Sequence, residues 1–380
     1  MQNELLALEK KHCIDWRKVK LERLFDITGT KSLDAGKLTF VDSGINFIGR
    51  TFEFNGIQGK IIKQNFEPNA PFTITATVIG NYKYVKYQKE PYYVSQNINK
   101  LTPKFNINEK LAKFFMTYIQ NFVSQYDGQQ SGYKLDEMNN YEIDIPYKGS
   151  EIAFDYIEEF IATLEAERLA TLEAYLTITN LKDYILTSEE VQVLADIDKV
   201  EWREFKIVGD IFTVKNTHNI LSRYIVENSG NTPYLTASNN NNAVGTYIEF
   251  EENLIDEGNS IFIGGKTFVV TYQEKDYFSN DSHNLALYLK ESEKRTKLIQ
   301  LFLVTTITKS LSPLYSWGDS ISNKKIQKDI IILPVKSDHT PDYAFMSTYI
   351  KAMQKIVIKN VVEWADKRIE KTKEVVEKMR

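Results

Sequence analysis

Apolar positions along the chain follow two patterns, and both patterns occur in each half of the sequence. Roughly the first 130 residues of each half hold short runs of Val, Ile, Thr, Tyr and Phe that are broken by Gly, Asn and Pro. This pattern predicts a series of short strands. Residues 150–208 and 342–380 contain neither Gly nor Pro, and this favours long helices. A further helix is predicted over 109–122, where apolar residues recur at helical spacing. The chain therefore reads as a strand-rich module followed by a helix, twice over.

Polar residues at the helix ends indicate where these helices begin. Ser150 is the predicted N-cap of the first long helix. Thr340, followed by Pro341 at the first helical position, is the predicted N-cap of the second. Thr187 and Glu190 have the spacing of a capping box, which predicts a short helix before the second module.

The two halves also share sequence. The heptapeptide DWRKVKL at 15–21 has a near copy, EWREFKI, at 201–207. Similar pairs follow at offsets of 185 to 188 residues, down to IDIP at 143–146 and IILP at 331–334. A repeat of this period predicts an internal duplication. We expect the tryptophan in each heptapeptide to pack at the point where its module begins.

Each long helix carries an apolar stripe. The stripe positions are Ile157, Ile161, Leu164, Leu172 and Leu176 in the first helix, and Ile350, Met353, Val357, Val361 and Trp364 in the second. Each helix could lie on its own module, or the two could pair along their stripes; the near-heptad spacing favours pairing. A helix of about 35 residues is about 50 Å long, so such a pair would hold the two modules apart.

Composition places the chain among ordinary globular proteins, with 42% hydrophobic and 26% charged residues. The single cysteine, Cys13, excludes a disulfide framework and a cysteine-rich zinc site, and it fits a reducing compartment. The N-terminal residues do not read as a signal peptide, and no apolar run has the length of a membrane span. We therefore expect a cytoplasmic protein without a membrane partner.

Charge is distributed unevenly. The net charge is −4, but residues 150–199 alone hold 12 acidic against 3 basic residues. Residues 31–148 carry 14 basic against 11 acidic residues. The total charge therefore neither supports nor excludes DNA as a partner, and the acidic helix is better suited to contact protein than phosphate.

Recognisable catalytic motifs are missing from the sequence. The four histidines are scattered, which makes a zinc site improbable, and no phosphate-binding glycine motif or nucleophile motif is present. The string at 312–315 lacks the second proline of an amino-methyltransferase motif, and Glu204 to Lys206 forms an ExK without a preceding PD. A chain of this size without such a site is predicted to be a binding or scaffolding subunit that holds no metal or cofactor.

Two kinds of segment could bind nucleic acid. Lysine and tyrosine alternate over 81–89, on a predicted strand, and this favours either phosphate contacts or simply a solvated strand. Polar residues gather in two loops at equivalent places of the repeat; such loops either read bases through Arg, Asn and Gln or are only turns. The candidates for DNA contact are Arg50, Thr51, Asn55, Gln58, Lys60, Lys83, Lys86, Lys134, Thr236, Ser238, Asn239, Asn240, Asn241, Lys266, Lys324 and Lys325.

Taken together, these features resemble the DNA-specificity (S) subunits of bacterial type I or type I-like (type IIB or IIG) restriction-modification systems. The resemblance covers nearly the whole chain and rests on the two tryptophan heptapeptides, on 320–326 leading to 331–334, and on the helix after each module. The tail at 342–364 is most similar to the branch whose partner subunit carries both methylation and cleavage.

The resemblance implies an α+β chain with two repeated mixed α/β target-recognition domains, separated by long helices that pair as an antiparallel coiled coil. The implied boundaries are 1–149 and 199–338 for the two domains, and 150–198 and 339–380 for the spacer helices. Each domain would bind one half of a bipartite duplex DNA target. The helices would set the gap and dock an adenine methyltransferase, which uses S-adenosylmethionine, and a fused or separate restriction subunit.

Two other interpretations remain open from the residues. A duplicated protein-binding scaffold would show no salt-dependent, sequence-selective binding to duplex DNA. An enzyme with an unrecognised site would turn over a substrate without a partner.

Overall fold

The computed structural model describes residues 2–128 and 131–378 and divides the chain into two compact units, residues 1–172 and 173–380. The boundary between the units falls within one long helix, α5 (Phe154–Ile178). Each unit has its own sheets and its own apolar core. Within the described residues, no helix has an apolar stretch long enough to cross a bilayer.

The first unit is rich in short strands. These strands are β1 (Asp15–Lys20), β2 (Phe25–Gly29), β3 (Ser32–Leu33), β4 (Ile45–Ile48), β5 (Ile57–Ile61), β6 (Thr73–Thr77), β7 (Val85–Gln88), β8 (Tyr92–Ser95), β9 (Ile98–Pro103), β10 (Glu142–Lys148) and β11 (Glu151–Ile152). The helical segments before α5 include α1 (Gln2–His12), α2 (Leu21–Leu24), η1 (Ala35–Lys37), η2 (Glu53–Gly56), α3 (Glu109–Ser124) and α4 (Leu135–Asn139). The helix predicted over 109–122 is confirmed by α3.

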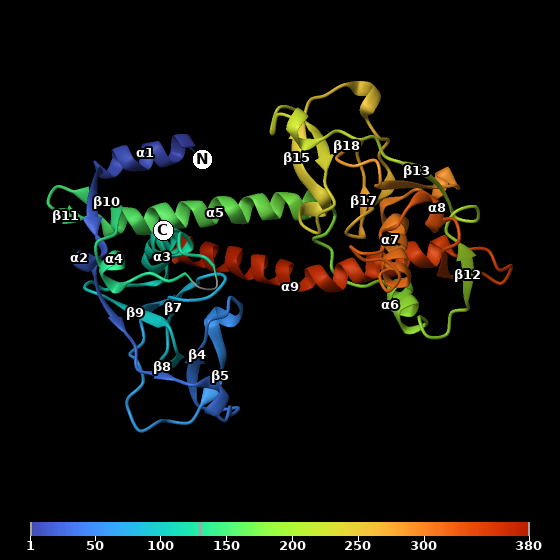
Figure 1. The fold of residues 1–380 in the computed structure, drawn as a ribbon. Coiled ribbons are helices and arrows are strands. Elements are labelled where there is room, and N and C mark those ends of the chain that lie inside the picture. Colours follow the sequence, from blue (N-terminus) through green and yellow to red (C-terminus); the bar gives the residue numbers. More distant parts are fainter. Residues whose placement is uncertain (1, 129–130, 379–380) are drawn as a thin grey trace. The chain divides into compact units, whose positions relative to one another are not determined.

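Two four-stranded sheets form the body of this unit. One is antiparallel, in the order β2-β9-β6-β7, and α3 packs against β6 and β7. Every residue of β6 is buried, because the strand is central in the sheet and covered by this helix. The other sheet has the order β3-β8-β4-β5, with β8 parallel to both of its neighbours. Figure 1 shows β4, β5 and β8 at the end of the unit that lies away from β1 and β10.

The second unit has an equivalent series of elements. Its strands include β12 (Trp202–Lys206), β13 (Phe212–Asn216), β14 (Thr232–Leu235), β15 (Val244–Ile248), β16 (Ser260–Gly264), β17 (Val269–Gln273), β18 (Phe278–Ser279), β19 (Leu285–Leu289) and β20 (Ile330–Pro334). Its helical segments include α6 (Ser188–Ala195), η3 (Ser222–Tyr224), η4 (Asn241–Ala243), η5 (Glu252–Leu254), η6 (Ser292–Lys294), α7 (Lys297–Leu311), α8 (Asn323–Ile326) and α9 (Tyr343–Lys378).

The sheets of the second unit repeat the topology of the first. The order β13-β19-β16-β17 matches β2-β9-β6-β7, strand for strand, and the order β15-β14-β18 matches β5-β4-β8. In the larger sheets, β6 pairs antiparallel with β7 and β16 pairs antiparallel with β17. In the smaller sheets, β8 runs parallel to β4 and β18 runs parallel to β14. The predicted duplication is therefore confirmed, as two α+β modules that are each followed by a long helix.

The duplicated heptapeptides form the first strand of each module. β1 pairs antiparallel with β10, and β12 pairs antiparallel with β20, in the same register: Trp16 lies opposite Pro146 and Trp202 opposite Pro334. The Trp16 ring meets Tyr156 edge-on with centroids 6.1 Å apart, and the Trp202 ring stacks on a phenylalanine of α7 at 6.4 Å. The heptapeptide thus joins the start of a module to its last strand, just before the long helix; each tryptophan contacts one aromatic ring there but stays exposed by 39% and 38%.

Both long helices begin later than the sequence predicts. Ser150 is not the N-cap of α5, because the chain after it forms β11 and the helix starts only at Phe154. Thr340 is not the N-cap of α9 either: the carboxylate of Asp342 accepts a hydrogen bond from the Phe345 N–H at 3.0 Å and caps the helix. The capping box predicted from Thr187 and Glu190 is confirmed at the start of α6.

A buried ion pair joins α6 to α9. Lys355 on α9 donates to a carboxylate oxygen of Glu190 at 2.9 Å and to the carbonyl of Ile185 at 2.8 Å, and both charged side chains are almost fully buried. Burial alone would raise the pKa of Glu190, but the Thr187 N–H and the Lys355 ammonium outweigh it and hold that pKa below its usual value. The hydrogen bond to Glu190 raises the pKa of Lys355. The contact between these helices is therefore charged at neutral pH.

This ion pair shifts the buried face of α9 away from the predicted apolar stripe. Val357, Val361 and Trp364 are exposed by 70%, 38% and 51%, so they lie outside the contact of α9 with α6, and their role at a helix-helix or partner interface stays a prediction. Ile350 and Met353 are half-buried. The residues that α9 buries over this stretch are Ala352, Lys355, Val362 and Ala365. The apolar pattern misses this face because it counts a lysine as exposed, whereas Glu190 compensates the buried charge.

The stripe of α5 is only partly buried. Ile157 belongs to the core of the first unit and Leu176 is fully buried. Ile161, Leu164 and Leu172 are half-buried.

Candidate nucleic-acid interface

The loop between β4 and β5 has a defined backbone conformation. The Gly49 N–H donates to the carbonyl of Gly56 at 2.8 Å and closes the loop. Phe54, Asn55 and Gly56 form a continuous left-handed run, with φ of 48°, 57° and 81°. Left-handed backbone is unusual for residues other than glycine, so three in succession define one particular loop shape.

The loop between β14 and β15 has the same conformation. The Thr236 N–H donates to the carbonyl of Ala243 at 2.8 Å, and φ is 49°, 52° and 68° at Asn241, Asn242 and Ala243. Both loops begin at a β-bulge, between Phe47 and Ile48 in one unit and at the equivalent residues of the other. The repeat therefore preserves the backbone of the loop while its sequence changes.

An asparagine holds each loop against the neighbouring sheet. In the first unit, the amide nitrogen of Asn55 donates to the carbonyl of Tyr87 at 2.8 Å, and the amide nitrogen of Gln88 donates to the carbonyl of Asn55 at 3.4 Å. Asn55 was predicted as a DNA contact, but this geometry gives it the role of fixing the loop to β7.

The second unit repeats these contacts. The amide nitrogen of Asn242 donates to the carbonyl of Tyr272 at 3.0 Å, and the amide nitrogen of Gln273 donates to the carbonyl of Asn242 at 2.9 Å. The matching pairs show that the asparagine in each loop belongs to the scaffold. The side chains that precede it in the loop are the ones that differ between the units.

The first loop presents a mixture of basic, polar and aromatic groups. Arg50, Gln58 and Lys60 are exposed, and the Arg50 guanidinium lies 3.4 Å from the carbonyl of Ile79. Thr51 is half-buried, and its hydroxyl accepts a hydrogen bond from the Glu53 N–H at 3.4 Å.

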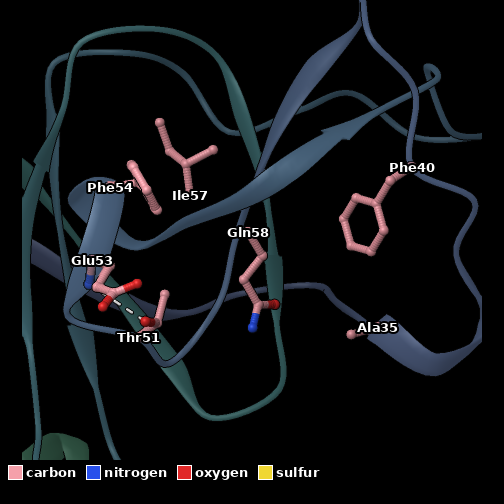
Figure 2. A pocket seen from close by; sticks show the side chains of 7 residues that line it. All are labelled: Ala35, Phe40, Thr51, Glu53, Phe54, Ile57 and Gln58. Atoms are coloured by element: carbon pink, nitrogen blue, oxygen red, sulfur yellow. Dashed lines mark hydrogen bonds between the residues drawn. The ribbon is translucent and has the colours of Figure 1, made fainter. Parts of the chain in front are cut away.

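A hollow of about 410 Å³ opens beside this loop. Figure 2 shows Phe54 and Ile57 on one side of it, Phe40 on the other and the amide of Gln58 reaching in between. A neighbouring hollow of about 560 Å³ shares Gln58 and reaches Arg50 and the loop between β6 and β7. Gln58 and Arg50 thus lie at a concave surface where they can meet a ligand.

The second loop presents amides and hydroxyls. Asn239, Asn240 and Asn241 are exposed, whereas Thr236 and Ser238 are half-buried. The Asn240 N–H donates to the Ser238 hydroxyl at 3.2 Å and the Asn241 amide donates to the carbonyl of Val244 at 3.1 Å. These contacts are local, and they leave the tip of the loop polar and uncharged.

The lysines predicted on the tyrosine-rich strand differ in their surroundings. Lys83 is only 1% exposed, and its ammonium donates to the carbonyls of Gly80 and Tyr126, so the prediction that it meets DNA phosphate is wrong. The backbone carbonyls replace water around its charge. Lys86 is half-buried, its Nζ lies 4.2 Å from the ring centre of Phe52, and burial lowers its pKa.

The other candidate lysines are exposed. Lys134 lies just before α4. Lys324 and Lys325 lie on α8, the short helix of the second unit that corresponds to α4. Lys266 pairs with Asp281 at 3.1 Å, and Lys325 pairs with Asp319.

Exposed aromatic residues are the part of this surface that the sequence did not predict. Phe52 and Phe54 are exposed by 67% and 81%, and Tyr82 by 67%. Apolar periodicity assigns such residues to a core. The internal repeat holds the signal that could have found them, because the position of Phe54 is filled by Asn241 in the other copy.

Among the described residues, no group of three or more His, Cys, Asp or Glu side chains is placed to hold a metal ion. The interface is therefore built from hydrogen-bonding, basic and aromatic groups.

Comparison with known proteins identifies the repeat. The family model described as "Type I restriction modification DNA specificity domain" matches residues 14–174 and 199–363, one match for each module. A curated relative, the specificity subunit of a type II restriction enzyme from Heyndrickxia coagulans, is 24% identical over 344 residues, covering 90% of this chain and 95% of the relative.

Two solved structures of S subunits are similar to this chain. The S subunit of a type I restriction-modification system from M. genitalium has a TM-score of 0.55 at 15% identity, covering 96% of this chain and 95% of that one. The S subunit of Thermoanaerobacter tengcongensis has a TM-score of 0.32 at 14% identity, covering 93% and 91%. The first of these likenesses establishes the fold.

Proposed function

The chain belongs to the type I restriction-modification DNA specificity family, and on this basis we propose that each of its two modules binds one half of a bipartite duplex DNA target. Members of this family are non-catalytic recognition subunits, and methylation and cleavage take place on the subunits with which they assemble. The proposal concerns how this chain divides the reading of DNA between its modules.

The observation that supports this division is the pair of loops after β4 and β14. They share their closing hydrogen bond and a run of three left-handed residues, whereas the displayed side chains differ. A loop that keeps its backbone in both modules while its exposed side chains differ is suited to reading two different DNA sequences with one fold.

The first loop would read its half-site with Gln58 and Arg50. A glutamine amide pairs with the edge of adenine and an arginine with guanine in the major groove. Thr51, Lys60 and Lys86 would hold the adjacent sugar-phosphate backbone, with Lys134 as a further phosphate contact.

The second loop would read its half-site through amides. Asn239, Asn240 and Asn241 can pair with adenine, and the hydroxyls of Thr236 and Ser238 can bond to bases or phosphates. Lys266, Lys324 and Lys325 would supply the positive charge on this side.

The long helices would serve the assembly. We propose that α5 and α9 pair antiparallel, so that the modules, at 1–149 and 199–338, stand at a fixed gap along the DNA. The exposed stripe of Val357, Val361 and Trp364 on α9 supports a protein partner on that helix. That partner would be an adenine methyltransferase that binds S-adenosylmethionine, with a fused or separate restriction subunit. The relative from Heyndrickxia coagulans is itself named as the specificity subunit of a type II restriction enzyme.

The test is to co-express this chain with its neighbouring methyltransferase and to map methylated adenines across the host DNA. We expect one target with two defined halves and a fixed gap. Replacing residues 31–148 with the matching module of another family member should change one half and leave the other half and the gap intact. Simultaneous change of both halves, or methylation without sequence preference, would contradict the proposal and favour a scaffold without direct DNA readout.

A further inference from the structure

Phe54 combines two properties that folding does not favour. Its side chain is 81% exposed, so it adds little to the core of the first unit. Its φ of 48° lies in the left-handed region, where a bulky side chain crowds its own backbone. Backbone strain of this kind clusters at ligand sites but also occurs at the exposed Phe72, so the surroundings of Phe54 decide the argument.

The equivalent position of the second module shows that the loop can form without a phenylalanine there. Asn241 occupies it with φ of 49°, and asparagine adopts left-handed backbone more readily than phenylalanine does. The loop shape is therefore compatible with a small polar residue. The aromatic ring of Phe54 is not required to build the loop, and its presence calls for another cause.

The surroundings of Phe54 are aromatic and basic. Phe52, exposed by 67%, stands two residues earlier, with the Lys86 ammonium 4.2 Å from its ring centre and the Tyr84 ring 5.8 Å away. Across the hollow in Figure 2 lies Phe40, which is 44% exposed.

This combination suits a nucleic-acid duplex better than a protein partner. Arg50 and Lys60 are exposed on the same loop and strand, and Glu53 is the acidic residue between them. Proteins that unstack DNA insert apolar side chains between base pairs and hold the flanking phosphates with arginine and lysine. A purely apolar protein contact would not need the cations.

We propose that Phe54 inserts into the base stack of the first half-site, with Phe52 supporting it from the side and Lys60 and Lys86 on the flanking backbone. The second module, with Asn241 in the same place, reads its half-site without opening the stack. The first half-site is therefore deformed, and its sequence is selected partly by how easily a base step opens. This inference rests on the proposed function, since it assumes that the loop faces DNA.

The experiment uses the complex of this chain with its methyltransferase and the target found by methylation mapping. Duplexes carry 2-aminopurine at successive positions of each half-site, because the emission of this base rises when it is unstacked. We expect a several-fold rise at one step of the first half-site and none in the second. The variant Phe54→Asn should abolish that rise, and Phe54→Trp should retain it.

Matched variants separate insertion from a general effect on folding. Phe72 is also an exposed phenylalanine with a left-handed backbone, at φ 60°, but it does not line the hollow, so Phe72→Asn should leave the fluorescence rise intact. Asn241→Phe should create a new rise in the second half-site.

The outcomes distinguish this inference from the function it rests on. Tight binding of the target with no unstacking at the first half-site, or equal fluorescence with Phe54→Asn, overturns the insertion and leaves bipartite recognition standing. Failure of the complex to select any bipartite sequence overturns both. If Phe54→Asn instead weakens capture of the methyltransferase while DNA fluorescence stays unchanged, the aromatic surface is a protein contact and the proposal is wrong.

Discussion

The two modules share one topology but display different side chains in their loops. The loop after β4 and the loop after β14 share their closing hydrogen bond, their left-handed run and their asparagine lock. Their tips diverge, because one displays Arg50, Phe52 and Phe54 where the other displays Ala237, Asn239 and Asn241. The residues that differ are those whose side chains do not hold the loop against the neighbouring strand. Comparison within one chain therefore separates scaffold from recognition without any second protein.

The long helices diverge in the same way, and here the difference lies in packing. Lys355 of α9 is buried against Glu190, whereas Arg168, at the equivalent position of α5, is exposed. The second unit thus has a buried charged lock between its short and long helices, whereas the first unit joins α1 to α5 through the more exposed pair of Lys11 with Glu159.

Breaking this lock is expected to have the largest effect. Lys355→Met leaves Glu190 with only the Lys351 ammonium, 3.7 Å away and more exposed, as a cation, and should destabilise the chain by about 3 kcal/mol, because the buried carboxylate is then poorly compensated. Urea denaturation followed by circular dichroism measures the loss. The matched change Arg168→Met should cost much less, and the pair Lys355→Met with Glu190→Leu should recover most of the stability. Equal losses for the Lys355 and Arg168 variants would show that the lock contributes nothing.

Removing the asparagine locks tests whether the two loops are held equally. Asn55→Ala and Asn242→Ala each lose a hydrogen bond to the neighbouring strand and place alanine in a left-handed backbone. We expect each to cost about 1–2 kcal/mol of unfolding free energy, and the two values to agree within about 0.5 kcal/mol.

Thermal melting of the full chain gives both values. Asn239→Ala is the control, because this residue lies on the exposed tip and its replacement should stay within about 0.5 kcal/mol of wild type. A large difference between the two lock variants would mean that the repeat preserves the geometry of the loops but not their energetics.

Exchanging the residues at the loop tip should separate stability from recognition. Phe54→Asn relieves left-handed strain and should stabilise the chain by roughly 0.5–1 kcal/mol, even as it weakens binding to the first half-site. Phe72→Asn should give a similar gain with unchanged DNA binding. Denaturation and a DNA titration at fixed salt measure the two effects. A variant at Phe54 that lost stability would contradict the view that the ring is kept for its ligand.

The division into two repeated modules could be predicted from the sequence because it depends on patterns that survive divergence. The paired heptapeptides and the IDIP and IILP strings are strands that close each module, and their register is the same in both. The helix at 109–122 followed from its apolar spacing. The starts of α5 and α9 were predicted wrongly, because a short strand and an aspartate cap lie where the sequence offers equally plausible caps.

The surface was harder to predict because side-chain type does not reveal the partner of a charge. Lys83 appears in an alternating strand as a phosphate contact, yet backbone carbonyls surround it in the structure. Lys355 interrupts an apolar stripe, yet it is the buried residue there and Val357 is the exposed one. Phenylalanine is a residue type that usually lies in a core, yet Phe54 lies exposed at the tip of a loop. For both lysines the decisive partner comes from a distant part of the chain.

The charged lock also gives the smallest and last of the expected effects, a dependence of the unfolding free energy on pH. The folded pKa of Glu190 is below its ordinary value of 4.5, so its contribution to stability is present above about that pH and is lost as the pH falls through the folded value. The folded pKa of Lys355 is above 10.5, so its contribution is lost only as the pH rises beyond that. Between these limits the lock should be independent of pH. Denaturation of wild type and Glu190→Gln at pH 7, 5 and 3.5 tests this. The stability gap between them should narrow from pH 5 to 3.5, because protonation gives wild type the same neutral partner that glutamine provides. A gap of constant size over that range would mean that Glu190 is not ionised when it meets Lys355.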